Sequence, residues 1–415
     1  MAEDLIRTDV CIVGAGPAGA AASIELSKAG INHIIADSAG FPRNKPCGDI
    51  LTSGVIRALN RLNPEILTQL SVGGFLAPVW KTQVFPPNGK AISLDFLPLD
   101  GEEGQASCYS VSRYDLDLAL VNFIKASPFA DFRENCRIKS AIHSESCMRL
   151  ETENGPVIEA RLVIFATGSG SSILNSLGHP AAKEETAVGI RAHYEGVNWN
   201  PAETGLFLDA GCMPGGLYIT PLPGGMCNVN LVISLEKVRK EKLLLREKME
   251  ELLHSIPSLK MAFASARRIG NPEGSKLYLG TKPRKVSGER YLLAGDAAGL
   301  IEFFSGNGIP QAYSSGAIAA GFAAKVLAEN DLSALHMKQY DAELYRKIKT
   351  DKIGGQVVFP LLHRPAFSRM VLRFLNHLSS RPQTNDLLRD LLYEKNPTRI
   401  LRNPRFYYRL LWKNH

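Results

Sequence analysis

The stretch that decides the fold is "DVCIVGAGPAGAAASIELSKAG", residues 9–30. Its apolar start predicts a short buried strand. The Ala-rich part from Pro17 to about Ala29 predicts a helix that stops at Gly30. Three glycines in the spacing GxGxxG join the two elements: Gly14, Gly16 and Gly19. A strand, a glycine turn and a helix in this order predict a Rossmann-like nucleotide-binding unit.

The three glycines have separate expected roles. Gly14 permits the tight turn, Gly16 lets the backbone approach a pyrophosphate, and Gly19 lets the helix pack on the strand. The pyrophosphate is expected at the helix N-terminus, which begins at Pro17. A second predicted strand ends at Asp37, eighteen residues after Gly19, where a carboxylate can accept a hydrogen bond from a ribose hydroxyl. The sequence therefore predicts a dinucleotide site.

Two later segments distinguish between NAD and FAD. "ARLVIFATGSGS", residues 160–171, is typical of a buried strand that ends in Ala-Thr-Gly. Residues 288–329 indicate a strand, a Gly-Asp pair, a glycine-rich loop and a long Ala-rich helix. The residues of interest in these segments are Thr167, Gly168, Gly295 and Asp296. An NAD dehydrogenase needs neither segment, which favours FAD.

Together these segments resemble large flavoproteins of the para-hydroxybenzoate hydroxylase superfold. The resemblance implies an α/β fold, with a Rossmann-like FAD-binding domain, an inserted mixed or antiparallel β-sheet domain for the substrate, and C-terminal helices. It also implies that Asp296 holds the ribityl chain. The loop expected beside the isoalloxazine ring contains Gly306, Asn307, Gly308 and Ile309. Glycines there would let backbone N–H groups reach the flavin pyrimidine edge.

The segment "SRYDLDLALVNFIKAS", residues 112–127, also matches the superfold. Ser112 is the expected helix cap, with Asp115 three positions on. The resemblance implies that Arg113 reaches FAD from this helix, and a surface ion pair is the alternative. No second GxGxxG follows, so NAD(P)H or another reductant would dock only transiently.

Three parts are expected in the chain. They are a discontinuous FAD-binding domain (1–75, 105–185 and 280–345), a substrate-binding β-sheet domain (76–104 and 186–279) and a basic C-terminal helical region (346–415). The second part is predicted from alternating apolar and polar residues.

The stretch "FPRNKPCGD", residues 41–49, places Cys47 in a turn just after the second strand. Here the chain resembles the geranylgeranyl reductase family, which carries PxxKxCG at this point. The resemblance implies that Cys47 lies at the mouth of the catalytic cavity, that Gly48 permits close approach to the ring, and that Lys45 supplies positive charge. Beside Lys45, the thiol is expected to be partly ionised. Three roles stay open for Cys47: proton donor to a substrate carbon, cavity wall, or small apolar filler.

Family reductases carry a YxWxFP stretch followed by NVG in their sheet domain. This chain keeps Tyr218, Pro223, Asn228 and Val229, but has Thr220, Leu222 and Asn230 in place of the Trp, the Phe and the Gly. Tyr218 is a candidate to orient or protonate the substrate, and an ordinary sheet aromatic is the alternative. The three differences alter the expected prenyl tunnel, so we expect a specialised apolar substrate of isoprenoid or polyketide type, from secondary metabolism. The WxWxIP stretch of related halogenases is absent, so halogenation is not expected.

Basic residues concentrate near the C-terminus. Residues 360–415 hold eleven Lys and Arg against three acids, a net charge of +8, whereas the preceding residues net to −1. In residues 367–380 we expect one apolar face of Met370, Val371, Phe374, Leu375 and Leu378, beside Arg369 and Arg373. We expect this region to close one end of the cavity. Contact with a membrane surface, or with an acidic carrier protein that bears the substrate, is the second hypothesis; no motif indicates nucleic-acid binding.

The remaining features favour a cytoplasmic enzyme with reduced thiols and no metal site. No apolar run reaches the roughly 18 residues of a membrane span, the start does not resemble a signal or transit peptide, and the seven cysteines form no CxxC pair. Two activities stay open. Reduced FAD could pass a hydride from N5 to a carbon–carbon double bond, which the "KPCGD" stretch favours. Alternatively, the chain could be an FAD-dependent monooxygenase that hydroxylates or epoxidises through a flavin C4a-hydroperoxide. A flavin-binding protein without chemistry is a third, different class.

Overall fold

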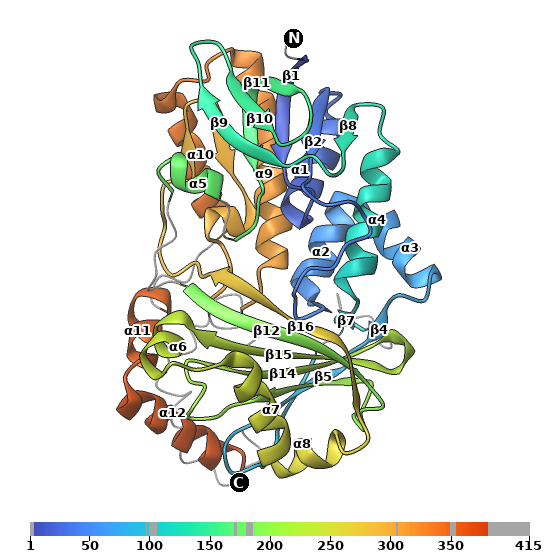
Figure 1. The fold of residues 1–415 in the computed structure, drawn as a ribbon, viewed down its shortest axis with the longest axis vertical. Coiled ribbons are helices and arrows are strands. Elements are labelled where there is room, and N and C mark those ends of the chain that lie inside the picture. The colour runs from blue at the N-terminus through green and yellow to red at the C-terminus, as the bar shows by residue number, and fades with distance from the viewer. Residues whose placement is uncertain are drawn as a thin grey trace.

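Two β-sheets lie one above the other, each with helices packed on it (Figure 1). The structure, a computed structural model, describes residues 4–96, 98, 106–169, 172–179, 186–303, 306–348 and 354–380. Within these residues the first sheet has eight strands and the second sheet has seven, and a small three-stranded sheet joins them. The mixed α/β architecture predicted from the sequence is confirmed.

The first sheet has the strand order β17-β18-β11-β1-β2-β8, and β10 and β9 extend from β11. Its strands are β1 (Leu5–Val13), β2 (His33–Ala36), β8 (Ala130–Arg133), β9 (Ile138–His143), β10 (Met148–Thr152), β11 (Val157–Phe165), β17 (Ser287–Gly288) and β18 (Tyr291–Leu293). The run from β18 to β8 is parallel. Because β1 runs down from the N-terminus in Figure 1, the carboxyl ends of these strands face the second sheet. Ligands bind at such carboxyl ends in open α/β sheets.

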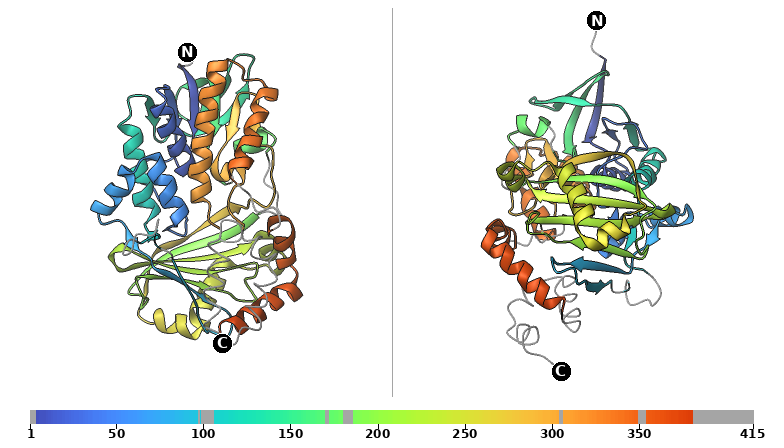
Figure 2. Two further views of the ribbon diagram at one scale, coloured as in Figure 1. Left: turned by 180° about the vertical axis from the view of Figure 1, so that it is seen from behind. Right: turned by 60° about the horizontal axis from the view of Figure 1, so that its bottom comes forward.

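Helices cover this first sheet. They are α1 (Pro17–Lys28), α2 (Ser53–Leu62), α3 (Glu65–Val72), α4 (Arg113–Lys125), α5 (Ser172–Ser176), α9 (Ile309–Glu329) and α10 (Ala334–Lys347). The long helix α9 lies beside α1 (Figures 1 and 2). Their close approach depends on Gly316, since a Cβ there would lie 2.1 Å from the carbonyl oxygen of Ala18. The glycine therefore brings α9, which begins at the predicted flavin loop, against the nucleotide-binding helix.

The second sheet has the strand order β16-β12-β15-β14-β13-β5-β6. Its strands are β5 (Lys81–Phe85), β6 (Ile92–Asp95), β12 (Thr186–Glu195), β13 (Glu203–Phe207), β14 (Gly215–Leu222), β15 (Met226–Ser234) and β16 (Arg267–Tyr278). All neighbours are antiparallel except β5 and β13. The small sheet is β3 (Ile50–Leu51), β7 (Tyr109–Ser110) and β4 (Ala77–Pro78). The exact limits of the three expected parts of the chain stay a prediction.

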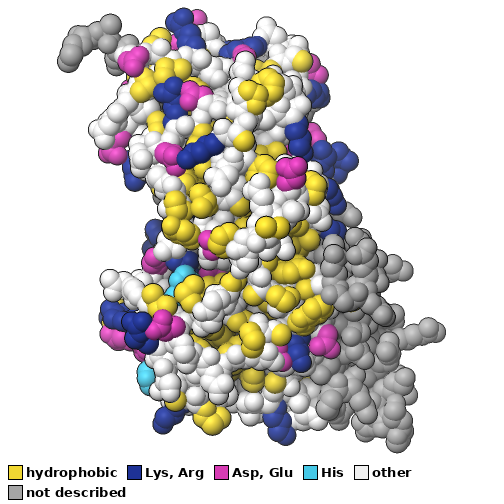
Figure 3. Space-filling view, turned by 90° about the vertical axis from the view of Figure 1, so that its right-hand side faces the viewer, with side chains coloured by type: hydrophobic (Ala, Val, Ile, Leu, Met, Phe, Trp, Pro, Cys, Tyr) yellow, Lys and Arg dark blue, Asp and Glu magenta, His cyan; other side chains and the backbone are white. Residues whose placement is uncertain are grey.

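The two faces of the second sheet differ. On the outer face, Ile219, Val229 and Leu231 are fully buried against α7 (Leu245–Ser255) and α8 (Pro257–Ala262). Because side chains alternate along a strand, the residues between them face the first sheet. These inward residues are Arg191, His193, Tyr218, Asn228 and Asn230. The alternation therefore presents a polar row to the region where the two sheets meet. Figure 3 views the molecule from the side on which α3 and α4 lie, and it shows hydrophobic side chains gathered where the two sheets meet.

Three further helices lie beside the second sheet: α6 (Leu235–Glu241), α11 (Phe359–Leu362) and α12 (Pro365–Leu378). The expected helix over 367–380 is present, but the expected apolar face is only partly buried: the expectation holds for Leu378 and is wrong for Met370 and Phe374. Leu372 and Leu378 are buried, whereas Met370 and Phe374 are 55% and 37% exposed. The burial follows the contact with the turn at Asn88, which hydrogen-bonds Asn376 and Ser379. The residues beyond Ser380, and with them most of the basic tail, lie outside the described residues.

Candidate active site

The turn between β1 and α1 forms a cradle of backbone. Gly14 has a φ of 104°, and its N–H donates to Ala36 at 2.7 Å. A Cβ on Gly19 would lie 1.8 Å from the carbonyl oxygen of Gly14, so the turn closes tightly on the helix. At Gly16, in contrast, a Cβ would meet only the Arg43 guanidinium, at 3.7 Å. The open side of Gly16 and the uncapped start of α1 at Pro17 leave backbone donors directed at a ligand.

Asp37 follows directly after β2 and is nearly buried. Its carboxylate accepts from the N–H of Ala15 at 2.8 Å and of Ala39 at 2.9 Å. A carboxylate has about four acceptor positions, so it retains capacity for a ribose hydroxyl. Arg43 lies 3.7 Å from this carboxylate and stacks over the ring of Phe41. Arg43 was not predicted, although it stands in the same stretch as Cys47; its place beside Gly16 makes it a candidate phosphate contact.

The segments after β11 and β18 meet at Lys45. The Nζ atom of Lys45 lies 3.8 Å from Asp296, and a Cβ on Gly168 would lie 3.1 Å from the same nitrogen. Next to Gly168, the hydroxyls of Thr167 and Ser169 are buried and have no hydrogen-bond partner among the described residues. Three loops far apart in sequence thus converge below the carboxyl ends of the parallel strands.

The predicted flavin loop lies on the same side. Gly295 and Gly306 have φ values of 64° and 70°, in the left-handed region that favours glycine. A Cβ on Gly306 would meet nothing within 4 Å, whereas one on Gly308 would lie 3.1 Å from a carboxylate oxygen of Asp296. Asn307 lies 3.4 Å from the hydroxyl of Thr52, and Ile309 begins α9. The loop therefore combines a tight packed side with an open side, as a bound ring requires.

The Cys47 loop, residues 42–49, is fastened to the second sheet by its backbone. The carbonyl oxygen of Cys47 accepts from the side-chain amides of Asn228 at 2.9 Å and Asn230 at 3.0 Å. The carbonyl oxygen of Lys45 accepts from Arg191 at 3.2 Å. These contacts fix the loop between the two sheets. The sequence pattern places Asn228 and Asn230 in a motif but does not indicate their bonds to this loop.

A buried carboxylate completes this attachment. Asp49 is 1% exposed and has a φ of 56°, unusual for a residue other than glycine. One of its oxygens accepts from Asn228 at 2.5 Å and lies 3.4 Å from His193. Arg191, 4.0 Å from Asp49, also pairs with Glu273 at 2.7 Å. The alternation of 226–234 signals the position of Asn228, but nothing in the sequence signals the pairing with Asp49.

The Cys47 thiol lies near the guanidinium group of Arg113. Arg113 is 4% exposed and makes two hydrogen bonds to Asp117, at 2.8 and 2.7 Å. Burial raises the pKa of the half-buried Cys47, and the nearby Arg113 guanidinium only partly offsets this effect. The thiol is therefore protonated at neutral pH. The expectation of partial ionisation beside Lys45 is wrong, because the Lys45 ammonium group approaches Asp296 instead.

Arg113 itself forms neither a surface ion pair nor an exposed contact. Asp117 is fully buried and also lies 3.2 Å from Arg43. The predicted capping of α4 is confirmed, since the N–H of Asp115 donates to Ser112 at 3.1 Å. The cap sets the helix start so that Arg113 points inward to Cys47. Whether Arg113 contacts the cofactor stays a prediction.

Tyr218 lies on the inward face of β14, opposite Asn230 on β15. Burial, together with the charge of Glu302, raises the pKa of Tyr218 to about 12. The phenol is therefore protonated at neutral pH and can donate a hydrogen bond. Its position on the same sheet face as Asn228 keeps it a candidate for orienting a substrate.

The chain as a whole fits a dinucleotide with a flavin ring. The glycine cradle at Gly16, the orphaned hydroxyls of Thr167 and Ser169, and the open Gly306 all lie on one side of the first sheet. The FAD binding domain family model matches residues 7–344. The chain belongs to this FAD-binding family. It is an FAD-dependent oxidoreductase.

Several curated relatives of the flavoprotein are named as reductases. It is 27% identical to menaquinone reductase of Mycobacterium tuberculosis over 354 residues, which cover 79% of this chain and 78% of the relative. It is 28% identical to digeranylgeranylglycerophospholipid reductase 2 of Methanopyrus kandleri over 394 residues, 92% of each chain. The predicted likeness to geranylgeranyl reductases is confirmed.

Solved structures share the fold of the flavoprotein. A geranylgeranyl bacteriochlorophyll reductase-like protein from Thermoplasma acidophilum superposes with a TM-score of 0.80 at 19% identity, over 96% of this chain and 99% of that one. A flavin-dependent brominase superposes with a TM-score of 0.69 at 19% identity, over 95% and 100%. At these identities the likeness concerns the fold alone.

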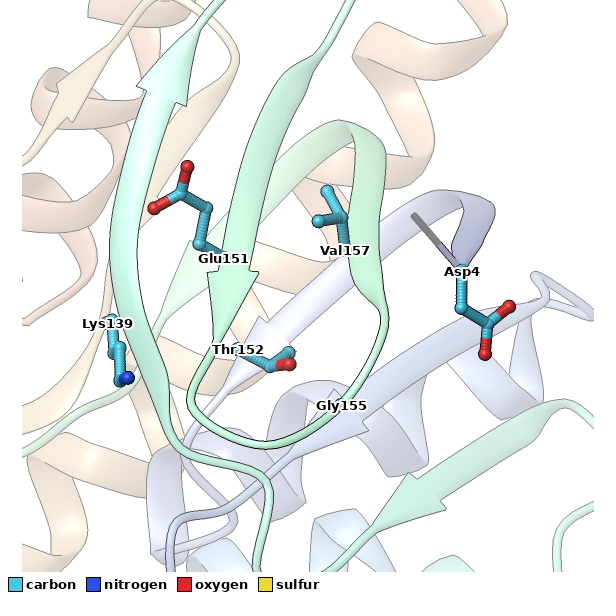
Figure 4. A pocket seen from close by; sticks show the side chains of 6 residues that line it. All are labelled: Asp4, Lys139, Glu151, Thr152, Gly155 and Val157. Carbon is cyan, nitrogen blue, oxygen red and sulfur yellow. The ribbon is translucent and has the colours of Figure 1, made fainter. Parts of the chain in front are cut away.

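A separate surface pocket lies at the other end of the first sheet (Figure 4). It is lined by Asp4, Lys139, Glu151, Thr152, Gly155 and Val157. Asp4 precedes β1, whereas Gly14 follows it, so the nine residues of β1 separate this pocket from the cradle by roughly 30 Å. The pocket therefore lies at the amino ends of the strands, away from the site of the flavoprotein.

Proposed function

We propose that the flavoprotein reduces a carbon–carbon double bond of an apolar, isoprenoid-type substrate. Reduced FAD, when bound, supplies a hydride for one carbon. The second carbon then needs a proton, and the residues around the cavity decide where that proton comes from. The observation that carries the proposal is the Cys47 thiol, which burial keeps protonated among the loops that would hold FAD.

The Cys47 loop has the rigidity that proton delivery requires. The backbone carbonyl oxygen of Cys47 accepts hydrogen bonds from two side chains, those of Asn228 and Asn230. In the proposed step the Sγ–H bond breaks as the new C–H bond forms, and the resulting thiolate is stabilised by the Arg113 guanidinium before solvent reprotonates it. The cavity wall and the small filler are the competing roles for Cys47.

An apolar cluster on the same side of the second sheet supports an apolar substrate. Ala187 and Val232 share the inward face with Arg191 and Asn230, and pack with Ile301. The other members of this cluster are Leu277, Leu279, Phe303 and Phe359. The inward face thus changes from polar near Cys47 to apolar near α11, which suits a molecule with a reactive end and a hydrocarbon tail. The names of the relatives, which specify a menaquinone and a prenylated phospholipid, support the same substrate class.

The test is an anaerobic reaction of the photoreduced holoenzyme with a geranylgeranyl lipid in detergent. We expect flavin reoxidation without dioxygen and a product that gains two hydrogens by mass spectrometry. Reoxidation only with dioxygen, and a product that gains oxygen, would overturn the proposal in favour of the monooxygenase alternative. NAD(P)H is proposed as the physiological reductant, to be tested by flavin reduction before the lipid is added.

The variant Cys47→Ala tests whether the thiol is the proton donor, independently of whether the double bond is reduced. We expect a loss of about 10²-fold in the rate of flavin reoxidation by the lipid, in the range of general acid catalysis. Cys147→Ala is the matched control, because Cys147 is also a half-buried cysteine but lies in the turn between β9 and β10. Full turnover in Cys47→Ala would reject the proton-donor role and leave double-bond reduction standing.

A further inference from the structure

Helix α12 presents an exposed face of mixed basic and apolar character. The face consists of Arg369, Met370, Arg373 and Phe374, all exposed, and is called the α12 face below. These four residues lie at spacings of one, three and four, which place them together on one side of a helix. An exposed patch that joins large apolar side chains and has a polar rim is a feature of interaction surfaces.

The remaining side of α12 is occupied. Leu372 and Leu378 are buried, and the hydrogen bonds from Asn88 to Asn376 and Ser379 hold the helix against the turn between β5 and β6. The orientation of the helix is therefore fixed by contacts within the protein. The α12 face points away from the second sheet as a consequence of this packing.

Charge identifies the chemistry of a partner. Helix α12 contains no acidic residue, and residues 360–415 carry a net charge of +8 while the preceding residues net to −1. An anionic surface would therefore be attracted to this region more strongly than to the rest of the molecule taken as a whole. The exposed Met370 and Phe374 add a requirement that charge alone does not explain, namely a partner that accepts apolar side chains.

The α12 face is also connected to the apolar cluster of the cavity. Helix α11 packs against α12, and its Phe359 is buried in that cluster, with its ring centroid 6.0 Å from that of Phe303. One short helix thus separates the exposed face from the apolar end of the inward sheet face. Val357, just before α11, is itself 52% exposed.

We propose that the α12 face docks the flavoprotein on an anionic lipid bilayer, so that an apolar substrate enters from the membrane past α11. This inference rests on the proposed function, since it supplies a source for the isoprenoid substrate. An amphipathic helix with arginines beside large apolar residues lies in the plane of a bilayer surface and inserts only its apolar side chains. No described helix is long and apolar enough to cross a membrane.

The experiment is sedimentation of the full-length holoenzyme with vesicles of phosphatidylcholine, alone or mixed with phosphatidylglycerol. We expect binding to the mixed vesicles only, and weaker binding as salt rises. Arg369→Gln/Arg373→Gln is expected to weaken this binding about 30-fold. Met370→Ser/Phe374→Ser is expected to weaken it as well, through lost insertion.

Arg57→Gln/Arg61→Gln is the matched control. Arg57 and Arg61 are exposed on α2 at the same spacing as Arg369 and Arg373, so the double substitution removes the same charge from another face. We expect this control to bind like the wild type. Flavin absorbance and circular dichroism of every variant verify that each is folded and loaded.

Each other outcome overturns the proposal. Absence of wild-type binding to the mixed vesicles would leave the α12 face without a lipid partner. Equal weakening in the α2 control would show that any positive charge suffices. Unchanged binding of Met370→Ser/Phe374→Ser would show a purely electrostatic contact, which suits an acidic carrier protein equally well. None of these results depends on turnover, so they are distinct from a failure of the proposed reaction.

Discussion

The side-chain amide of Asn230 donates a hydrogen bond to the carbonyl oxygen of Cys47 at 3.0 Å. The same amide donates to Asn228 at 2.7 Å, and Asn228 donates to the same carbonyl at 2.9 Å. Position 230 is one of those at which the chain departs from the reductase pattern, which has glycine there. The departure therefore adds a tie between the second sheet and the Cys47 loop.

Asn230→Ala should loosen this loop without unfolding the sheet. The substitution removes the hydrogen bonds from Asn230 to Cys47 and to Asn228. The carbonyl oxygen of Cys47 still accepts from Asn228, so we expect a cost of about 1–2 kcal/mol in the free energy of unfolding. The alkylation rate of Cys47, followed by peptide mass mapping in the holoenzyme, should rise several-fold. Val232→Ala, on the same face of β15, removes packing but no bond to the loop. Equal acceleration in that control would contradict the prediction.

The protonation state of Cys47 is open to a direct measurement. Because burial raises the pKa of this thiol, its thiolate fraction at a given pH is lower than that of an ordinary thiol. The rate of alkylation by iodoacetamide should therefore keep rising with pH above about 8.5, the ordinary value for cysteine. Accessibility scales the rate but does not move its midpoint. A rate that reaches its plateau below pH 8 would show a stabilised thiolate and contradict the prediction.

The sequence predicts what depends on local pattern. The turn at Gly14, the helix from Pro17 and the cap at Ser112 all follow from motifs whose spacing is fixed by backbone geometry. The contacts of Asp49 could not be predicted in this way. They join a turn to strands 144 to 179 residues later, and only the register of the second sheet determines them.

The exposed face of α12 was missed for a related reason. Helical spacing shows which residues share a side, but not which side packs against the protein. Asn88, from a distant turn, selects the packed side by bonding Asn376 and Ser379. The expectation that Cys47 is partly ionised is wrong for a similar reason. Lys45 is two residues away in sequence, but its ammonium group approaches Asp296. The charged group near the thiol is instead Arg113, which belongs to α4.

Gly16 and Gly19 should respond differently to alanine. A Cβ on Gly16 has no described neighbour nearer than 3.7 Å, so Gly16→Ala should change the stability of the apoprotein by no more than about 0.5 kcal/mol while weakening FAD binding. A Cβ on Gly19 would lie 1.8 Å from a carbonyl oxygen, so Gly19→Ala should destabilise the fold itself, by about 3 kcal/mol or more. Thermal unfolding of the apoproteins and titration with FAD separate the two effects. Normal FAD affinity in Gly16→Ala would contradict the cradle.

Two buried tyrosines provide the last comparison. Tyr340 is fully buried and its hydroxyl donates to the carbonyl oxygen of Leu293 at 2.9 Å. Tyr313 is 2% exposed and lies beside Cys47, Arg113 and Asp117, but its hydroxyl has no hydrogen-bond partner among the described residues. Burial strongly raises the pKa of Tyr313, so the phenol is neutral and retains a buried, unsatisfied donor.

Replacing each tyrosine with phenylalanine should therefore affect the free energy of unfolding differently. Tyr340→Phe leaves a buried carbonyl without its donor and should cost about 1–2 kcal/mol in the free energy of unfolding. Tyr313→Phe removes an unpaired hydroxyl at almost constant volume and should be neutral or slightly stabilising, measured by denaturant unfolding of both holoproteins under the same conditions. A destabilisation of Tyr313→Phe as large as that of Tyr340→Phe would show that the Tyr313 hydroxyl is paired in solution.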